Sequence, residues 1–359
     1  MQILKKINKL RQVYIYFISQ VLFIIIFSTT FLNANTFRVS NIPISGPFEL
    51  NFNKNKVIDE GFRDSFISLI TMITTSGDKE TVQNTPTKEL KSLIDTFTIQ
   101  DENFINNEYF AKLEVTFNKK KVLSFLESKN IFPSIPKKNK VLLIPILMDI
   151  DNNNIYLFSD NVFYQKWNNE KKNYELLEYL LPSEDLEDLN TIQKLANSIE
   201  EHDFLNLIKK YDLQDYVISI IFKNKNELKI LSKINFKNTL KLDNQKFSNI
   251  DLNNEKDIKL ILDKLKTIYE DYWKKNNEIN TSIKLPLTIS IESNEYKKIR
   301  NLEKILNNNH LISKFYILKF DNKNTYFKII YNGSPKTLLN DLSKENYYIK
   351  MENDIWNIQ

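Results

Sequence analysis

Val-Leu-Leu-Ile-Pro-Ile-Leu-Met at residues 141–148 and Tyr-Val-Ile-Ser-Ile-Ile-Phe at residues 216–222 are two nearly continuous apolar runs. Strands that are apolar on both faces are typical of a sheet covered on both sides. A helical stretch is expected between them, at residues 191–211. The order strand, helix, strand predicts parallel pairing through a right-handed crossover. We therefore expect a central Rossmann-like three-layer α/β module over residues 140–274. Its remaining elements are alternating strands and a long helix, at residues 227–236, 239–242 and 255–274.

Residues 283–359 alternate between the apolar spacing of strands and that of helices. Ser334 followed by Pro335 is a favourable helix start. The expected strands and helices lie at residues 285–291, 295–308, 311–320, 326–331, 335–342 and 347–358. This order, βαββαβ, predicts a ferredoxin-like module over residues 283–359.

Residues 35–130 are expected to form an N-terminal αβ module. Residues 109–117 alternate between apolar and polar side chains, as a half-buried strand does. The other expected elements are a strand, a helix, a helix start and a second helix, at residues 36–44, 58–74, 85–89 and 120–128. Residues 131–139, with two prolines, and the polar residues 275–282 are expected to be linkers.

Residues 1–34 have the composition of an export signal. Four basic residues and no acid precede Val13, an apolar run reaches Leu32, and Ala34 offers a small residue for cleavage. About 20 apolar residues also suffice to span a bilayer, so an uncleaved inner-membrane anchor at residues 13–32 is the alternative. Either reading places the rest of the chain outside the cytoplasm, because the positive flank stays inside. We expect a periplasmic, exported protein that meets the membrane only through this segment.

Composition excludes several classes of function. The 359 residues predict two or three domains and contain no cysteine, which excludes disulfides, thiolate metal sites and cysteine nucleophiles. Two histidines leave little for zinc or triad chemistry, and four isolated glycines exclude a Gly-rich phosphate loop. Without the four N-terminal cations, 46 basic residues face 45 acidic ones, so charge gives no argument for nucleic-acid binding.

The order of these elements resembles an uncharacterised bacterial family, domain of unknown function 2066. The residues that carry the resemblance are Gly61–Phe66, Leu113–Phe117, Val141–Pro145, Leu181-Pro182, Tyr331-Asn332-Gly333 and Trp356. The resemblance covers most of the chain after the signal and rests on spacing and hydrophobic pattern. It implies an exported bacterial protein and brings no catalytic residues.

One acidic segment has the spacing of a calcium loop. Asp149, Asp151, Asn153 and Asp160 occupy positions one, three, five and twelve. The sixth position, where such loops carry glycine, is Asn154, and the flanking residues are expected to be strands. Asp and Asn also tolerate the left-handed turn conformation, so a hairpin is the favoured interpretation. A calcium- or glycan-binding module is the alternative.

A second acidic segment, residues 181–188, contains four carboxylates within Glu184–Asp188. Paired carboxylates can perform acid–base chemistry, which makes a hydrolytic enzyme centred on Asp185 a possible function. Acids are also favourable in the first turn of a helix, and a helix start is the favoured interpretation.

Other single residues are interpreted structurally. His202 is expected on a solvated helix face, and His310 at a helix end. Arg63 is expected in a structural pair, with a carboxylate as the natural partner. Trp167 and Trp356 are expected to be core anchors, with a binding groove as the alternative for Trp167.

These features favour a non-enzymatic envelope protein that binds or scaffolds other envelope components. No catalytic, cofactor-binding or metal-ligating residue is assigned, no cofactor is expected, and no specific small molecule is predicted. A periplasmic hydrolase using carboxylates near Asp185 and a calcium- or glycan-binding module are the alternatives. A cleft with acids of raised pKa would favour the enzyme, and exposed apolar surface on the sheets would favour the adaptor.

Overall fold

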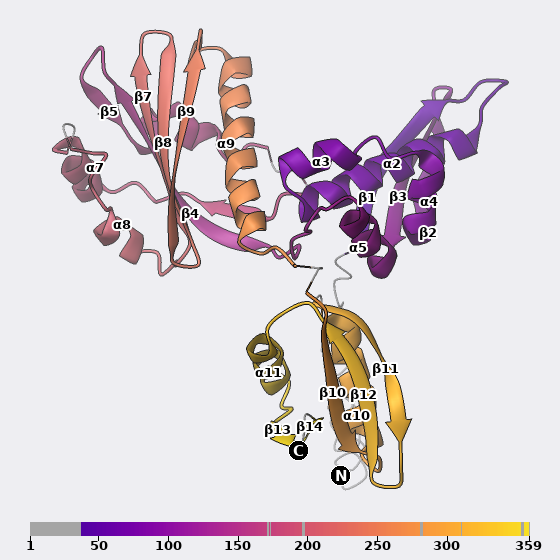
Figure 1. The fold of residues 1–359 in the computed structure, drawn as a ribbon. Coiled ribbons are helices and arrows are strands. Elements are labelled where there is room, and N and C mark those ends of the chain that lie inside the picture. Colours follow the sequence, from indigo (N-terminus) through magenta and orange to yellow (C-terminus); the bar gives the residue numbers. More distant parts are fainter. Residues whose placement is uncertain are drawn as a thin grey trace, which may run out of the picture. The chain divides into compact units, whose positions relative to one another are not determined.

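The computed structural model describes residues 37–358, except residues 171, 173, 196–197, 281–282, 310 and 353–354. The expected signal or anchor at residues 1–34 and the expected helix end at His310 lie outside the described residues. The described part is a mixed α/β protein with three sheets, which confirms the predicted fold class (Figure 1). Contacts divide the chain once, between Arg38 and Val39, and the predicted three-module division stays a prediction.

The first sheet has the strand order β1-β3-β2. Its strands are β1 (Arg38–Pro47), β2 (Ile94–Ile105) and β3 (Glu108–Phe117), and its helices are α2 (Lys54–Ile73), α3 (Ser76–Val82), α4 (Thr87–Leu93) and α5 (Lys119–Ser128). The alternation on β3 is confirmed, because every second side chain from Tyr109 to Phe117 is buried. Strand β2 was not predicted, because its side chains are almost all exposed and no buried stripe marks it in the sequence.

Gly61 allows α2 to approach the first sheet closely. A Cβ atom at this position would lie 2.5 Å from Ile44 Cγ2 and 2.9 Å from Leu113 Cδ2, and both side chains are buried. Gly61→Ala should therefore lower the free energy of unfolding by about 1–3 kcal/mol, the usual range for overpacking. Gly77→Ala in α3 is the matched control, since no atom lies within 4 Å of its Cβ. It should raise stability by up to about 1 kcal/mol. Urea unfolding measures both variants, and equal effects would contradict the close-approach argument.

The second sheet has the order β5-β4-β7-β8-β9, with β6 also paired to β4. The strands are β4 (Asn139–Asp149), β5 (Asn154–Tyr156), β6 (Leu177–Leu180), β7 (Tyr216–Asn224), β8 (Glu227–Phe236) and β9 (Thr239–Ser248). The predicted parallel pairing is confirmed, because β4 pairs with β7 in parallel register from Leu142 to Asp149. Strands β7, β8 and β9 then pair antiparallel, so the sheet is mixed.

Both faces of the second sheet are covered, which explains the continuous apolar runs (Figure 1). On β4, Val141, Leu143 and Leu147 pack toward the long helix α9 (Glu255–Lys275). The alternate β4 residues pack on the other side, with η1 (Phe158–Asp160), α7 (Leu186–Gln193) and α8 (Leu205–Lys209). A further short helix, α6 (Val162–Lys166), leads to Trp167 in the α9 layer.

The single helix predicted at residues 191–211 is wrong. Helix α7 ends at Gln193 and α8 begins only at Leu205, after Phe204 in the left-handed conformation with φ 56°. Ile192, Ile199 and Leu207 are all buried in one core cluster. Burial of a turn-rich segment at these positions produced a spacing that resembles one amphipathic helix.

The third sheet has the order β11-β12-β10-β14-β13. Its elements are β10 (Leu285–Glu292), α10 (Tyr296–Asn308), β11 (Ile312–Phe320), β12 (Asn324–Tyr331), α11 (Pro335–Lys344), β13 (Ile349–Glu352) and β14 (Ile355–Ile358). The β11–β12 hairpin is confirmed, and Ser334 caps α11 by accepting a hydrogen bond from the Thr337 N–H. The single closing strand predicted at residues 347–358 is wrong. It is an antiparallel pair, and β14 lies parallel to β10.

The two predicted linkers are joined by main-chain hydrogen bonds. The Ile135 N–H donates to the Asn277 carbonyl, and the Ile279 N–H donates to the Pro133 carbonyl. Ser134 and Glu278 form an isolated antiparallel β-bridge between the two segments. Among the described residues, no helix has both the length and the apolar character needed to cross a bilayer.

Candidate functional site

The most site-like feature of the second sheet is a cleft of about 540 Å³ beside strand β6. Within the described part of the chain, β6 pairs only with β4, so its other edge is open. All four residues of β6 line the cleft. Successive side chains of a strand point to opposite faces, so a cleft that contacts all four runs along the open edge. The further lining residues are Lys140, Asn168, Glu170, Glu175, Tyr211, Leu213 and Lys266.

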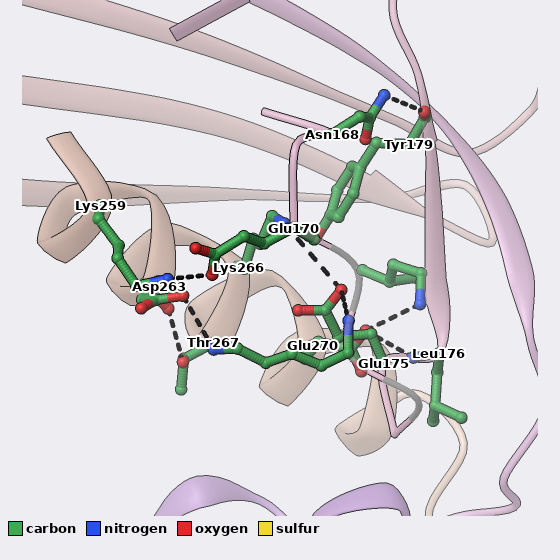
Figure 2. Close-up of polar contacts among 12 residues, drawn as sticks. Asn168, Glu170, Glu175, Leu176, Tyr179, Lys259, Asp263, Lys266, Thr267 and Glu270 are labelled. Atoms are coloured by element: carbon green, nitrogen blue, oxygen red, sulfur yellow. Dashed lines mark hydrogen bonds and ion pairs between the residues drawn. The ribbon is translucent and has the colours of Figure 1, made fainter. Parts of the chain in front are cut away.

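Two side chains bond to main-chain groups on this edge. Asn168 Nδ2 donates to the Tyr179 carbonyl at 3.1 Å, and Glu270 Oε1 accepts from the N–H groups of Leu176 and Leu177, both at 2.8 Å (Figure 2). The N–H and C=O of one strand residue point to the same side. The Leu177 carbonyl and the Tyr179 N–H therefore face the cleft, and among the described residues neither has a hydrogen-bond partner.

The segment before β6 is held against α9 by ion pairs. We call the described residues of 168–176 the strap. From the strap to α9, Glu170 pairs with Lys259, Lys172 with Asp263 at 2.9 Å, and Glu175 with Lys266 at 4.0 Å (Figure 2). The α9 partners recur every three or four residues, so they lie on one face of the helix. Lys266 also donates to the Glu170 carbonyl at 2.9 Å.

Several groups beneath the strap are buried ionisable side chains. Burial raises the pKa of Glu270 and lowers the pKa values of Lys266 and Lys274, in each case against the attraction of a nearby opposite charge. Burial also raises the pKa of Tyr179 well above its ordinary value. Within the described residues, Glu270 Oε2 and the Tyr179 hydroxyl are buried without a hydrogen-bond partner. Tyr179 and Lys266 line the cleft, whereas Glu270 and Lys274 line a separate pocket of about 130 Å³. Groups with shifted pKa values beside a cleft are a recognised mark of a functional site.

None of the candidate residues predicted from the sequence lines this cleft, and Trp167 lies behind it. Its indole is fully buried, stacks on Tyr269 at 6.1 Å and meets Tyr179 edge-on at 5.4 Å. The prediction that Trp167 is a core anchor is confirmed. One signal was available in the sequence: charges of both signs recur at helical spacing on α9, from Lys259 to Lys274. A solvated helix face has the same pattern, so the pattern alone does not identify a covered one.

The Asp149 segment is a hairpin, as predicted. Strand β4 turns back as β5 with Asp149 opposite Asn154, and Asn153 has a φ of 50°. Asp149 is buried and accepts hydrogen bonds from Lys223 Nζ at 2.9 Å and from the backbone and side chain of Asn152. Asp151 accepts from the Lys225 N–H at 2.6 Å. In the described part of the chain, no three His, Cys, Asp or Glu residues are grouped to hold a metal ion.

Asp149→Asn should lower the free energy of unfolding by about 1.5–3 kcal/mol, because it weakens hydrogen bonds to a buried charge. The hydrogen bond from Lys223 lowers the pKa of Asp149 in the folded protein. The contribution of the Asp149 carboxylate to the free energy of unfolding is therefore present above the unfolded pKa and is lost as pH falls through the folded pKa. The difference in free energy of unfolding between Asp149→Asn and wild type should stay constant from pH 7 to 5 and become smaller below about pH 4. Urea unfolding across this range measures it. Asp151→Asn is the matched exposed control and should change stability by less than about 1 kcal/mol; an equal effect of both variants would contradict the assignment.

The second acidic segment is a helix start, as predicted. Asp185 is the N-cap of α7 and accepts from the N–H groups of Glu187 and Asp188. Lys210 donates to both Asp185 and Asp188. The bond from Lys210 lowers the pKa of Asp185, which keeps that carboxylate ionised.

The remaining candidate residues are placed in structural roles. The helix-face position predicted for His202 is wrong, because this residue precedes α8 outside any helix and packs edge-on against Phe204. Arg63 donates to the Thr85 carbonyl and to Thr87 Oγ1, so it joins α2 to the start of α4. The expected carboxylate partner is thus replaced by neutral oxygens. Trp356 is buried in the core of the third sheet.

No protein-family model matches the chain, and no curated protein matches it.

Proposed function

We propose that this chain is a non-enzymatic exported protein of the cell envelope, and that it binds another envelope component through the cleft along β6. The observation that carries the proposal is the strand edge facing the cleft, with one carbonyl and one N–H that no described residue pairs with. Exposed strand edges are common recognition surfaces for other polypeptides. Leu180, at the end of the strand, is 44% exposed and offers apolar surface next to these groups.

Exposed apolar side chains elsewhere support a binding role. Ile317, Leu318 and Phe320 on the edge strand β11 are 48%, 50% and 78% exposed. Apolar side chains gathered on a strand edge favour an adaptor over a monomeric enzyme. The export part of the proposal is supported by the cationic and apolar sequence of residues 1–34. The resemblance to domain of unknown function 2066 agrees with export and assigns no activity.

A hydrolytic role centred on Asp185 is less well supported. A general acid needs a raised pKa, and the pairing of Asp185 with Lys210 moves its pKa the other way. The carboxylate whose pKa is raised, Glu270, uses one oxygen to hold the main chain of residues 176–177.

Site-specific photocrosslinking in cells tests the proposal. A benzophenone amino acid placed at Leu180 should give a discrete adduct with an envelope component after irradiation. The same amino acid at Lys229, an exposed position on β8, is the control and should give none. No adduct at Leu180, or the same adducts at both positions, would remove the cleft from the binding role.

A topology reporter fused after Gln359 tests the export part separately. Reporter activity is expected outside the cytoplasm, because the positive flank of the N-terminal segment stays inside. Activity confined to the cytoplasm would end the envelope assignment.

A further inference from the structure

We infer that the cleft receives an extended polypeptide segment, which joins the second sheet as a strand parallel to β6. This inference rests on the proposed binding function and names the form of the partner. It follows from three features of the edge. Two main-chain groups have no partner among the described residues, the side chains of Asn168 and Glu270 bond to the main-chain groups next to them, and the two walls of the cleft differ.

The unpaired groups have the arrangement that one residue of a parallel strand requires. In a parallel ladder, a residue opposite residue i donates its N–H to the carbonyl of residue i−1. Its own carbonyl accepts from the N–H of residue i+1. With Glu178 as the opposite residue, these groups are the Leu177 carbonyl and the Tyr179 N–H. Both face the cleft, because the Leu177 N–H and the Tyr179 carbonyl are bonded to Glu270 and Asn168 on the same side.

The bonds from Asn168 and Glu270 also limit what the edge accepts. They occupy the outer positions of the edge that a long strand would use, so only a short stretch of main chain is left to pair. Covering part of an edge in this way is a known protection against uncontrolled sheet extension. The edge therefore suits a short segment of a partner better than a second copy of a long strand.

The walls of the cleft differ on the two faces of β6. On one face, Leu180, Tyr211 and Leu213 present apolar surface, with Glu178 and its cross-strand neighbour Lys140 beside them. On the other face lie Lys266 and Glu175, beside the α9 layer. Because side chains of a bound strand also alternate, the partner segment should alternate apolar and polar residues. The mixed charges of Lys266 and Glu175 give no reason to expect a strongly charged peptide.

Proline substitution can test the main-chain contact directly. The Tyr179 N–H points to the open edge, away from β4, so Tyr179→Pro removes this donor and leaves the β4 pairing intact. Tyr179→Ala is the matched control, because both variants lose the same buried phenol. A tenfold difference in affinity corresponds to about 1.4 kcal/mol, the scale of one hydrogen bond.

The probe is a library of random linear 12-residue peptides displayed on phage and selected on the full chain in detergent. Selected peptides should alternate apolar and polar residues. At saturation they should slow hydrogen exchange at the Tyr179 amide at least about tenfold, as a new main-chain bond does, and leave Val217 in β7 unchanged. Tyr179→Pro should bind about tenfold more weakly than Tyr179→Ala.

Four outcomes would overturn the inference: no enriched peptide, binding without slower exchange at Tyr179, equal affinity of the proline and alanine variants, or binding of the peptides at another surface. The exchange experiment on the wild-type chain decides the question even where a variant does not fold. An adduct at Leu180 in cells together with any of these four outcomes would support the proposed binding function and contradict binding as a parallel strand. Peptide binding without an adduct in cells would support strand addition and contradict the proposed envelope function.

Discussion

Glu270→Ala is expected to lower the free energy of unfolding by about 3–5 kcal/mol, the usual effect of breaking a buried charge pair. Glu270 is 6% exposed and accepts hydrogen bonds from two buried N–H groups, those of Leu176 and Leu177. Alanine leaves both of these buried donors without their carboxylate partner. It also leaves Lys274, 4% exposed, without the carboxylate that lies 4.0 Å from its Nζ.

Glu270→Gln separates the loss of charge from the loss of the hydrogen bonds. The amide oxygen can still accept from both N–H groups, so this variant should lose less than half as much stability as Glu270→Ala. Burial raises the folded pKa of Glu270, so the stability linked to its protonation is present at low pH and is lost as pH rises through that pKa. Wild type should therefore lose stability relative to Glu270→Gln as pH rises above about 4, the ordinary pKa of a glutamate.

Tryptophan fluorescence during urea unfolding can follow these variants in a Trp356→Phe background. The chain has three tryptophans, and the remaining two, Trp167 and Trp273, both lie in the α9 layer of the second sheet. The signal then reports the part of the molecule that Glu270 holds. An effect of Glu270→Ala below about 1 kcal/mol, the range of ordinary surface substitutions, would show that the strap is not held by this carboxylate.

Trp167→Ala is expected to have an effect of similar size, about 3–5 kcal/mol, since it leaves a large cavity in a close-packed core. The indole has no exposed surface and contacts Tyr269 and Tyr179. Its Nε1 is buried, and no described residue accepts a hydrogen bond from it. Trp167→Phe removes this N–H and keeps an aromatic ring in the site, so it should lose less than half as much stability.

The fluorescence of Trp273 reports the unfolding of both Trp167 variants in the same Trp356→Phe background. The two variants also test whether the indole N–H has a role in the folded protein. If Trp167→Phe proved as damaging as Trp167→Ala, the N–H would matter more than the packing of the ring, and the core-anchor assignment would be wrong.

The positions of most elements follow from periodicity alone. The alternation on β3 and the double-sided apolar runs of β4 and β7 identify buried strands, because burial on one or two faces leaves a direct pattern in the sequence. The long stripe on α9 does the same for a helix. The elements that periodicity missed or joined have no such pattern. Strand β2 is exposed on both faces, the segment between α7 and α8 is buried without regular structure, and α3, β5, α6 and β6 are too short to show a period.

The sequence by itself determined a mixed α/β protein with parallel pairing of β4 and β7, and it indicated hairpin and helix-start roles for the acidic segments at Asp149 and Asp185. Only the tertiary structure decided that the strap covers the charged face of α9, that Glu270 holds the start of β6, and that no described strand pairs with the outer edge of β6. The physical reason is that helix spacing records which side chains share a face, whereas it carries no information about which distant segment covers that face. Charges at the same spacing serve a solvated helix equally well. Lys266 and Glu270 become buried only because residues nearly 100 positions away pack against them.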